Sequence, residues 1–423
     1  MINFLILIIY SFIIYSLFKK RNKYTVGFIF SLFWFGNIVF SNFFFSGYKL
    51  STELYLLLLV SSIFVFLGEF LASNSSKLLQ TNHTNEHFFY KYNNQRAKKI
   101  FFTIFLFAFL YPISNLINNG ISLSVLLSFQ GLLSTNNELA MARYSGETST
   151  SLLGQFFLVF VYLLPLFSGV YFFLARKKKF LFLALIPSLI VLLTQNTKLV
   201  FIACVMLLVS SFLITSMVYE KSLPKFKKKV YLRAIAFSFL FYVLLIFSFV
   251  ARLGSFSEET VRIANDKVSN YVAHVPALDL WLLENNKVVN REYDYGVNTF
   301  FGFFNAFGIV KREVGIFTDF HYFESNGRVY VTNIYTIYRY LIQDFGILGS
   351  ILFLFCLGFV FGKVNSLSTY FPNLALSVLS ALLFFVLNSY LSSIFAYMSF
   401  ILSFSLLLFL TKLLSIKKIT QTK

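Results

Sequence analysis

The chain has 423 residues, of which 58% are hydrophobic, 20% aromatic and only 13% charged. Soluble domains carry roughly 25% charged residues. This composition therefore excludes an ordinary water-soluble globule, and the mean hydropathy of +0.74 indicates a protein that lies largely in lipid. The formal net charge is nevertheless +19. In a soluble protein such a charge would indicate a nucleic-acid partner, so its meaning depends on where the charges fall.

Eleven apolar segments can cross a bilayer, for which a helix needs about 20 residues. They are approximately 2–18, 25–45, 54–71, 100–118, 151–174, 180–195, 199–219, 231–250, 344–362, 373–391 and 394–411. The first has neither a basic leader nor a small-residue cleavage site, so we expect a retained span rather than a signal peptide. The pattern predicts an all-α, polytopic membrane protein of about 11 transmembrane helices, with residues 1–423 as one membrane domain.

The segments between these spans form two alternating sets that differ in charge. One set contains 24 basic and 3 acidic residues, whereas the other contains 12 basic and 14 acidic residues. Basic residues accumulate in cytoplasmic loops, which places the N-terminus outside and the C-terminus in the cytoplasm. Two extracytoplasmic loops exceed simple turns, a smaller one over 119–150 and a large one over 251–343. Because the excess of positive charge lies in the predicted cytoplasmic loops, it is explained by the orientation of the chain in the membrane, and we expect no nucleic-acid partner.

The smaller loop contains Thr135-Asn-Asn-Glu138, the spacing of a helix capping box. This spacing predicts a short helix over Asn136–Tyr144 with Arg143 in its last turn. A cation at that position either complements the helix dipole or faces an anionic, lipid-linked substrate. The residues alone leave both roles open.

The large loop begins with Arg252 at the membrane boundary, where a cation ordinarily serves as an anchor. Ser255-Phe-Ser-Glu258 has capping-box spacing. Apolar positions then recur at intervals of three and four over 261–275, which predicts an amphipathic helix that Pro276 interrupts or restarts. The following NTFFGFFNAFG run, over 298–308, is too short to cross the membrane and is typical of an interfacial or re-entrant segment.

The loop ends in TNIYTIYRYLIQDFGILGSILFLF, which leads into the ninth span. Asn333 is a candidate N-cap, and positions 333, 337, 340 and 344 fall on one helical face. Asp344 and Gly346 mark a possible break where the helix enters the membrane. Further on, Gly358-x-x-x-Gly362 indicates close helix packing rather than a binding site.

The one recurring feature with catalytic potential is the set of arginines in the predicted extracytoplasmic loops. The sequence has no His, Cys and carboxylate cluster at zinc spacing, no phosphate-binding loop and no nucleophile elbow, so we predict neither a metal nor a cofactor. The planar fork of arginine suits phosphate recognition better than lysine does. The arginines on the predicted outer side are Arg143, Arg252, Arg262, Arg291, Arg312, Arg328 and Arg339. Lys198 lies in the outer turn between the sixth and seventh spans.

These features together resemble the bacterial O-antigen and capsule repeat-unit polymerases of the Wzy type. The stretch from Asn333 through Tyr335 and Asp344 to Gly349 is similar to the family segment that leads into the span after the large loop. Tyr295-Gly296 resembles the mid-loop Tyr-Gly element of the family. Arg252 follows the preceding span as a family arginine does, and Lys198 lies at a turn where the family often has Arg or Lys.

The resemblance implies a membrane glycosyltransferase in the bacterial inner membrane, with its active site on the extracytoplasmic face. Its donor and acceptor would be undecaprenyl-diphosphate-linked oligosaccharides, which it would polymerise into O-antigen of lipopolysaccharide or into capsular polysaccharide. A chain-length regulator protein is a further implied partner. Direct displacement at the anomeric carbon would invert its configuration, and arginine in place of a metal would neutralise the departing diphosphate.

Within that hypothesis, we assign the catalytic roles to Arg252, Arg339 and His321. The two arginines would stabilise the diphosphate, and His321 is the preferred base for the acceptor hydroxyl. His274, Asp319 or Asp344 could replace His321 in that role. The residues predicted to bind substrate are Arg143, Lys198, Arg328, Asn333, Tyr335 and Asp344.

Two other functions are compatible with the plan of the chain. O-antigen ligases, which transfer polysaccharide to lipid A-core, resemble it but typically have a His-Asn element near the end of the large loop, where this chain has Thr332-Asn333. Flippases of lipid-linked oligosaccharides would carry more spans and more charged residues at bilayer depth. Here only Glu69 lies clearly within a predicted span, which disfavours transport.

Overall fold

A computed structural model describes residues 2–75, 89–92, 94–144, 151–195, 197–253, 257–270, 272–285, 292–311, 316–317, 319–333 and 336–419. The helices of the first half are α1 (Ile2–Lys19), α2 (Thr25–Phe44), α3 (Thr52–Ser75), α4 (Asn94–Asn118), α5 (Phe129–Tyr144), α6 (Leu152–Ala175), α7 (Lys179–Gln195) and α8 (Lys198–Glu220). Those of the second half are α9 (Lys228–Leu253), α10 (Glu258–Asn270), α11 (His274–Asn285), α12 (Phe301–Ala306), α13 (Ile337–Leu367), α14 (Pro372–Asn388) and α15 (Met398–Leu414). Two 3-10 helices, η2 (Leu123–Leu127) and η3 (Ile394–Ala396), and strands β1 (Phe89–Tyr92), β2 (His321–Ser325), β3 (Arg328–Thr332) and β4 (Ser415–Ile419) complete the described elements.

The fold is a bundle of apolar helices that confirms a polytopic membrane protein. Within the described residues, eight helices are long and apolar enough to cross a membrane, namely α1, α2, α3, α4, α6, α8, α9 and α13. Three shorter apolar helices of 17 residues each, α7, α14 and α15, occupy the positions of the other three predicted spans. In lipid every backbone N–H and C=O group needs a partner within the protein, and a helix supplies one for each. A long apolar segment that crosses the membrane is therefore a helix, which is why hydropathy alone located these elements.

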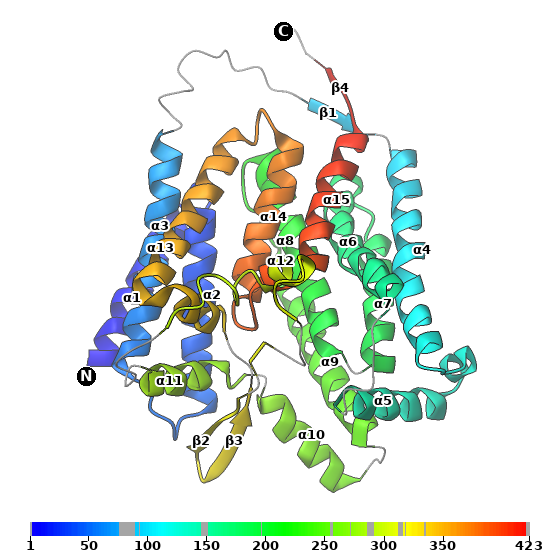
Figure 1. Ribbon diagram of the computed structural model, residues 1–423. Helices are drawn as coiled ribbons and strands as arrows, with labels where there is room; N and C mark the ends of the chain where they lie inside the picture. The colour runs from blue at the N-terminus through cyan, green and yellow to red at the C-terminus, as the bar shows by residue number, and fades with distance from the viewer. Residues whose placement is uncertain are drawn as a thin grey trace.

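The two termini lie at opposite ends of the bundle (Figure 1). Helices α5, α10 and α11 and the β2–β3 hairpin gather at the N-terminal end, which we call the loop end. Strands β1 and β4 pair antiparallel at the other end, and β2 and β3 form a second antiparallel pair. The prediction of helices alone therefore holds for the bundle but omits these two small sheets.

Helices α3 and α13 approach each other at glycines, and this contact is closer than any side chain would allow. A Cβ added at Gly358 would lie 2.0 Å from the carbonyl oxygen of Val65, and one added at Gly68 would lie 2.1 Å from that of Phe355. At Gly362 the corresponding distance to the carbonyl oxygen of Glu69 is 2.8 Å. The prediction that Gly358-x-x-x-Gly362 serves close helix packing is confirmed.

The buried carboxylate of Glu69 joins α3 to the first turn of α2. Its Oε1 accepts hydrogen bonds from the backbone N–H groups of Thr25 and Val26, at 2.8 and 3.2 Å, and its Oε2 accepts one from Gly27 at 2.8 Å. The first N–H groups of a helix have no partner within the helix, and a negative charge at that end is favourable. Glu69 therefore has a structural role in capping α2.

Helix α13 is broken at Gly346, as the sequence predicted. Gly346 has φ 69° and ψ 179°, a left-handed backbone conformation that glycine adopts without a steric penalty. A Cβ there would also lie 2.9 Å from the hydroxyl of Tyr293. The break separates a short segment that carries Arg339 from the long apolar segment that follows.

Two predicted helix starts, at Thr135 and Asn333, are wrong, because another residue caps each of these helices. Helix α5 begins at Phe129, and Ser128 Oγ accepts from the N–H of Gly131 at 3.0 Å, so Thr135 lies inside the helix. Ser257 Oγ accepts from Thr260 N–H at 3.1 Å at the start of α10, and the predicted cap Ser255 lies outside the described residues. Thr336, rather than Asn333, caps α13 by accepting from Tyr338 N–H at 3.3 Å.

The large loop contains the predicted amphipathic helix and an unpredicted hairpin. Ala264 and Val268 of α10 pack against the end of α9, and Pro276 lies in the first turn of α11, where the chain restarts as a helix. Helix α12 lies farther toward the C-terminal end of the bundle than α11 does (Figure 1). It packs on η3, since a Cβ at Gly302 would lie 2.8 Å from the carbonyl oxygen of Phe395.

We predict that Gly358→Ala destabilises the protein, because its new methyl group overlaps the backbone of α3. Overpacking of this kind costs roughly 1–3 kcal/mol. The thermal midpoint of the detergent-solubilised protein, followed by size-exclusion chromatography after heating, should fall by several degrees. Gly36→Ala is the matched control, because nothing lies within 4 Å of an added Cβ there. An equal effect of the two substitutions would contradict the close-packing interpretation.

Candidate functional site

Arg339 is the centre of a charged cluster at the loop end, and it lies in the first turn of α13. Its side chain is only 7% exposed. The guanidinium lies 4.0 Å from the ring centroid of Phe317 and 5.6 Å from that of Trp281. Aromatic rings attract cations that face them, so these rings fix the guanidinium where the membrane segment of α13 begins.

The carboxylate of Asp319 pairs with Arg339. Nη2 of Arg339 donates to Oδ1 of Asp319 at 2.8 Å. Partial burial raises the pKa of Asp319, but the hydrogen bond and charge of Arg339, together with His321, outweigh that effect and hold the pKa below its ordinary value. Asp319 therefore stays ionised at neutral pH, which makes it unsuitable as a proton donor.

His321 lies beside this pair, at the start of β2. Its side chain is buried, with Nε2 3.9 Å from Oδ2 of Asp319 and Nδ1 3.6 Å from Oε2 of Glu284. Burial lowers the pKa of His321 and the charge of Arg339 acts in the same direction, against the two carboxylates, which raise it. The net pKa lies below the ordinary value for histidine, so the imidazole is neutral at neutral pH and able to accept a proton.

Helix α11 supplies Trp281 and Glu284 to this cluster and is itself held by a buried carboxylate. Asp279 accepts hydrogen bonds from the hydroxyl of Tyr48 at 3.1 Å, from the backbone N–H of Ser51 at 3.0 Å and from the Ser51 hydroxyl. Ser51 directly precedes α3, so Asp279 ties α11 to the start of that helix. We call Arg339, Asp319, His321, Glu284 and Trp281 the Arg339 cluster.

Asp344 organises a second element, the Tyr295-Gly296 turn. Its Oδ1 accepts from the backbone N–H of Asn298 at 3.1 Å and from Asn298 Nδ2 at 2.9 Å, and its Oδ2 accepts from Thr299 N–H at 2.6 Å. Tyr295 and Gly296 both have positive φ, at 47° and 94°. The structure thus brings together two stretches on which the family resemblance rests, and it gives Asp344 a structural task, while its contact with substrate remains a prediction.

Lys198 belongs to a different group of helices, in which α5, α7, α8 and α9 meet. The side chain is 3% exposed, and Nζ lies 3.4 Å from the ring centroid of Phe249 on α9. Phe249 precedes Arg252 by one helical turn. Asn136 of α5 donates to the carbonyl oxygen of Leu193, 2.7 Å away, close to the end of α7. Lys198 therefore contacts α9 one helical turn before Arg252.

Two further predicted residues, Arg328 and Asn333, do not join either group. Arg328 is at the far end of the hairpin from His321, where Nη1 lies 3.4 Å from Oδ1 of Asp266. Asn333 is exposed and directly follows β3. Tyr335 lies outside the described residues, as do the side chains of Arg143 and Arg252, although the backbones of these two arginines are placed in α5 and α9.

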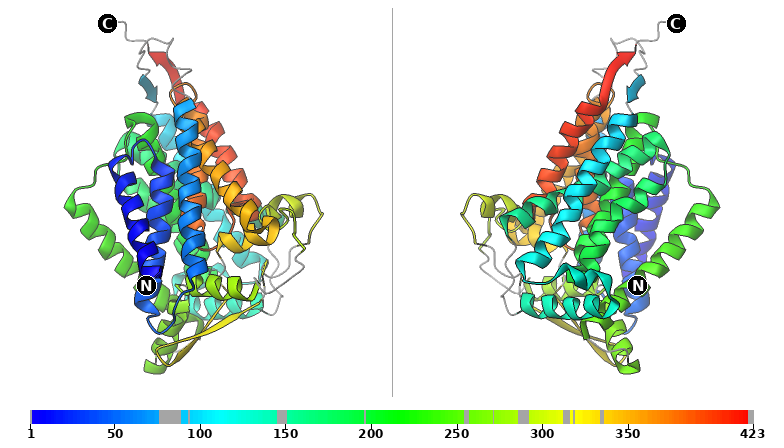
Figure 2. Two further views of the ribbon diagram at one scale, coloured as in Figure 1. Left: turned by 90° about the vertical axis from the view of Figure 1, so that its left-hand side faces the viewer. Right: turned by 90° about the vertical axis from the view of Figure 1, so that its right-hand side faces the viewer.

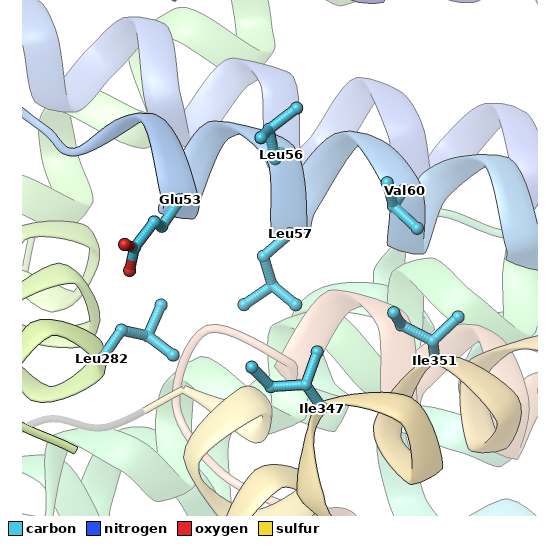
Figure 3. Close-up of a pocket in the computed structure, with 7 residues that line it drawn as sticks. All are labelled: Glu53, Leu56, Leu57, Val60, Leu282, Ile347 and Ile351. Carbon is cyan, nitrogen blue, oxygen red and sulfur yellow. The ribbon is translucent and has the colours of Figure 1, made fainter. Parts of the chain in front are cut away.

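An apolar cavity of about 230 Å³ lies between α3 and α13, just beyond the Gly346 break. Leu57 and Val60 of α3 face Ile347 and Ile351 of α13 across it, and Leu282 of α11 lies at the end that carries Glu53 (Figure 3). Leu282 follows Trp281 in the chain. Neighbouring residues of α11 thus border the cavity and the Arg339 cluster.

Trp281, Glu284 and Phe317 were not predicted from the sequence, because they come from segments of the loop that are distant in sequence from Arg339. One sequence signal would have predicted that the strand beginning at His321 pairs with the next strand, β3. Asn326-Gly327 between alternating residues is a strong hairpin signal, and both residues adopt positive φ, at 54° and 71°. The resulting register pairs His321 with Thr332.

Comparisons of this chain with protein-family models, with curated proteins and with solved structures found no match. In the part of the chain that the structure describes, no group of three or more His, Cys, Asp and Glu side chains could hold a metal ion.

We predict that His321 makes the stability of the protein depend on pH. A histidine whose folded pKa is depressed stabilises the fold fully above its unfolded pKa, about 6.5. That contribution is lost as the pH falls below this value toward the folded pKa. The thermal midpoint should therefore drop between about pH 7 and pH 5, and His321→Gln should reduce the drop. Glu284→Gln should enlarge it, because Glu284 favours the protonated imidazole. Identical pH profiles in all three proteins would contradict the assignment.

We also predict that Asp344→Asn loosens the turn at 295–300, because an amide nitrogen cannot accept the hydrogen bonds that the lost oxygen accepted. Hydrogen–deuterium exchange at the amides of Asn298 and Thr299 should accelerate, by about tenfold for each 1.4 kcal/mol lost. Asp294→Asn is the control, since the side-chain carboxylate of Asp294 contacts this turn through the 2.7 Å bond from Asn298 Nδ2, and its backbone carbonyl, which accepts from Val297 N–H at 3.0 Å, is unchanged by the substitution. Equal exchange in the two variants would show that Asp344 does not hold the turn.

Proposed function

We propose that this chain is a membrane glycosyltransferase that polymerises undecaprenyl-diphosphate-linked oligosaccharide repeat units into O-antigen or capsular polysaccharide. In this proposal all eleven apolar helices span the bacterial inner membrane, with the C-terminus cytoplasmic and the loop end outside. The observation that carries the proposal is the Arg339 cluster, which combines a buried cation, a neutral histidine and aromatic rings where an apolar helix begins.

Each part of the cluster suits one requirement of the reaction. An acceptor hydroxyl oxygen forms a bond to the donor's anomeric carbon, while the bond from that carbon to the diphosphate oxygen breaks and the electron pair leaves with undecaprenyl diphosphate. Arg339 neutralises the charge that develops on the departing diphosphate, with Arg252 as its proposed partner. His321 accepts the hydroxyl proton. A single displacement of this kind inverts the anomeric carbon.

The surroundings of the cluster supply support for a lipid-linked sugar. The apolar cavity between α3 and α13 suits part of a hydrocarbon chain, and it borders α11 on the segment that carries Trp281 (Figure 3). The faces of Trp281 and Phe317 offer flat apolar surfaces of the kind on which sugars can pack. The reaction as written requires no cofactor, since arginine provides the positive charge.

One observation favours transfer of polysaccharide to lipid A-core, the ligase reaction, as a second candidate. Ligases typically have His-Asn near the end of the large loop, where this chain has Thr332-Asn333. The hairpin register places His321 directly across from Thr332. A histidine is therefore available at that position from the neighbouring strand.

We predict that the protein restores laddered polysaccharide in a polymerase-null host that carries the matching repeat-unit pathway. Arg339→Ala should reduce the ladder strongly, since removing one electrostatic donor typically costs about 10²–10³ in rate, and Arg252→Ala should have a similar effect. Arg233→Ala, at the opposite end of α9, is the control. Membrane levels of all variants are compared by immunoblotting.

The outcome on gels separates the candidate functions. Single repeat units that convert to a ladder support polymerisation, whereas a preformed polymer that moves to lipid A-core supports ligation. Lipid-linked units trapped on the cytoplasmic face after deletion would support a flippase instead. If both arginine variants form the ladder as the unchanged protein does, the assignment of Arg339 and Arg252 is wrong.

A further inference from the structure

A polar cleft of about 500 Å³ lies at the loop end, between α10 and β3, apart from the Arg339 cluster. Its charged lining consists of Arg262, Asp266 and Lys267 from α10 and Arg328 from β3, and Tyr330 adds an aromatic ring. The apolar side of α10 is occupied by its packing on α9. The polar side of α10 therefore faces the hairpin across an open space.

The hairpin wall of the cleft is fixed by contacts with the connection between α2 and α3 and by ring stacking within the hairpin. Gly47 in the connection between α2 and α3 donates its backbone N–H to Ser325 Oγ at 3.2 Å, and Asn326 Nδ2 donates to Ser46 Oγ at 3.2 Å. Tyr330 stacks on Phe323, with ring centroids 5.3 Å apart and planes 17° apart. The cleft thus has one wall on a packed hairpin and the other on a helix packed against α9.

The charges in the cleft remain accessible to a ligand. Arg328 and Asp266 form a long ion pair of 3.4 Å, and their side chains are 69% and 55% exposed. Among the described residues that line the cleft, three cations oppose one carboxylate, so this lining has a net positive charge. The forks of the two arginines suit carboxylate or phosphate oxygens, and the carboxylate of Asp266 can accept hydrogen bonds from hydroxyl groups.

The position of the cleft favours a glycan over membrane lipid. Figures 1 and 2 show α10 and the hairpin at the extreme of the loop end, beyond the ends of α2 and α3. The hairpin also connects the cleft to the Arg339 cluster, because His321 begins β2 and Ser325, paired with Arg328, ends it. Four steps along an extended strand span roughly 13 Å. A ligand long enough to contact both sites must therefore be a chain of several units.

We propose that this cleft binds an acidic segment of the glycan chain, one whose sugars carry carboxylate or phosphate groups, and holds it while its end occupies the Arg339 cluster. This inference rests on the proposed function, since it takes the glycan as the ligand. Arg262, Lys267 and Arg328 contact the oxyanions, Tyr330 packs on a sugar face, and Asp266 accepts from hydroxyl groups. The cleft does not take part in the chemistry.

The test measures glycan binding by the full chain in nanodiscs of phosphatidylcholine, which carry no net charge. The probes are fluorescently labelled hexagalacturonate, which has a carboxylate on each sugar, and neutral maltohexaose of the same length. A phosphorylated oligosaccharide of similar length separates carboxylate from phosphate recognition. We expect tighter binding of the acidic probes, weakening as salt rises because exposed charges are screened.

Charge variants test whether the affinity for hexagalacturonate depends on the residues of the cleft rather than on the total charge of the protein. The triple variant Arg262→Gln, Lys267→Gln, Arg328→Gln should lose about tenfold or more in affinity for hexagalacturonate. Asp266→Asn should instead bind it more tightly, because the substitution removes a negative charge from the lining and leaves an amide oxygen that still accepts hydrogen bonds from hydroxyl groups. Arg233→Gln, near the opposite end of α9, removes one charge outside the cleft and should leave binding unchanged.

Several outcomes would overturn the proposal. These are equal binding of neutral and acidic probes, an unchanged affinity in the triple variant, and competition by vesicles of anionic phosphatidylglycerol, which would assign the cleft to lipid. Arg339→Ala keeps the two proposals separable, because it should reduce polymerisation strongly but leave the charges of the cleft, and therefore the preference for hexagalacturonate over maltohexaose, intact. Binding without polymerisation would remove the proposed function alone, and polymerisation without binding would remove this inference alone.

Discussion

The contact between α3 and α13 is the constraint on which the rest of the loop end depends. Glycines at 68, 358 and 362 let the two backbones meet at distances that leave no room for a side chain. Lipid provides no hydrophobic drive for helices to associate, so such close packing is a main source of their association in membranes. The start of α3 holds α11 through Asp279, and the start of α13 carries Arg339. The contact between α3 and α13 thus sets where Trp281 and Glu284 of α11 lie relative to Arg339 of α13.

The apolar helices and the charged loops of this molecule are stabilised by different interactions. The helices follow from one-dimensional hydropathy, and buried polar groups between them have specific partners, as Glu69 has with the first turn of α2. The loop end resembles a small soluble protein, with a hairpin, amphipathic helices and ion pairs of its own. Its charges fall into one group around the buried Arg339 and His321, with the more exposed Asp319 and Glu284 beside them, and a second, exposed group around Arg328.

The sequence was sufficient to predict the features that depend on local pattern. It located the apolar helices, the amphipathic α10, the break at Gly346 and the packing role of Gly358, because each is determined by composition or spacing within a few turns. It failed where neighbours in space decide, since Ser128 and Thr336 cap helices that nearby residues of similar type could equally have capped. Of the Arg339 cluster, Arg339 and His321 were predicted individually. Their connection through Asp319 and α11 depends on the hairpin and could not be read from spacing.

The break at Gly346 also divides the electrostatics of α13. A continuous helix has one positive end, whereas a helix interrupted at a residue with φ 69° has two, because the backbone dipoles of each segment sum separately. The first positive end lies at Ile337, beside Arg339 and the ionised Asp319. The second lies just after Gly346, where the negative end of the first segment also falls. Asp344 lies in that last turn of the first segment, and its carboxylate is held instead by the backbone N–H groups of Asn298 and Thr299. A single glycine thereby gives one helix two positions that attract negative charge.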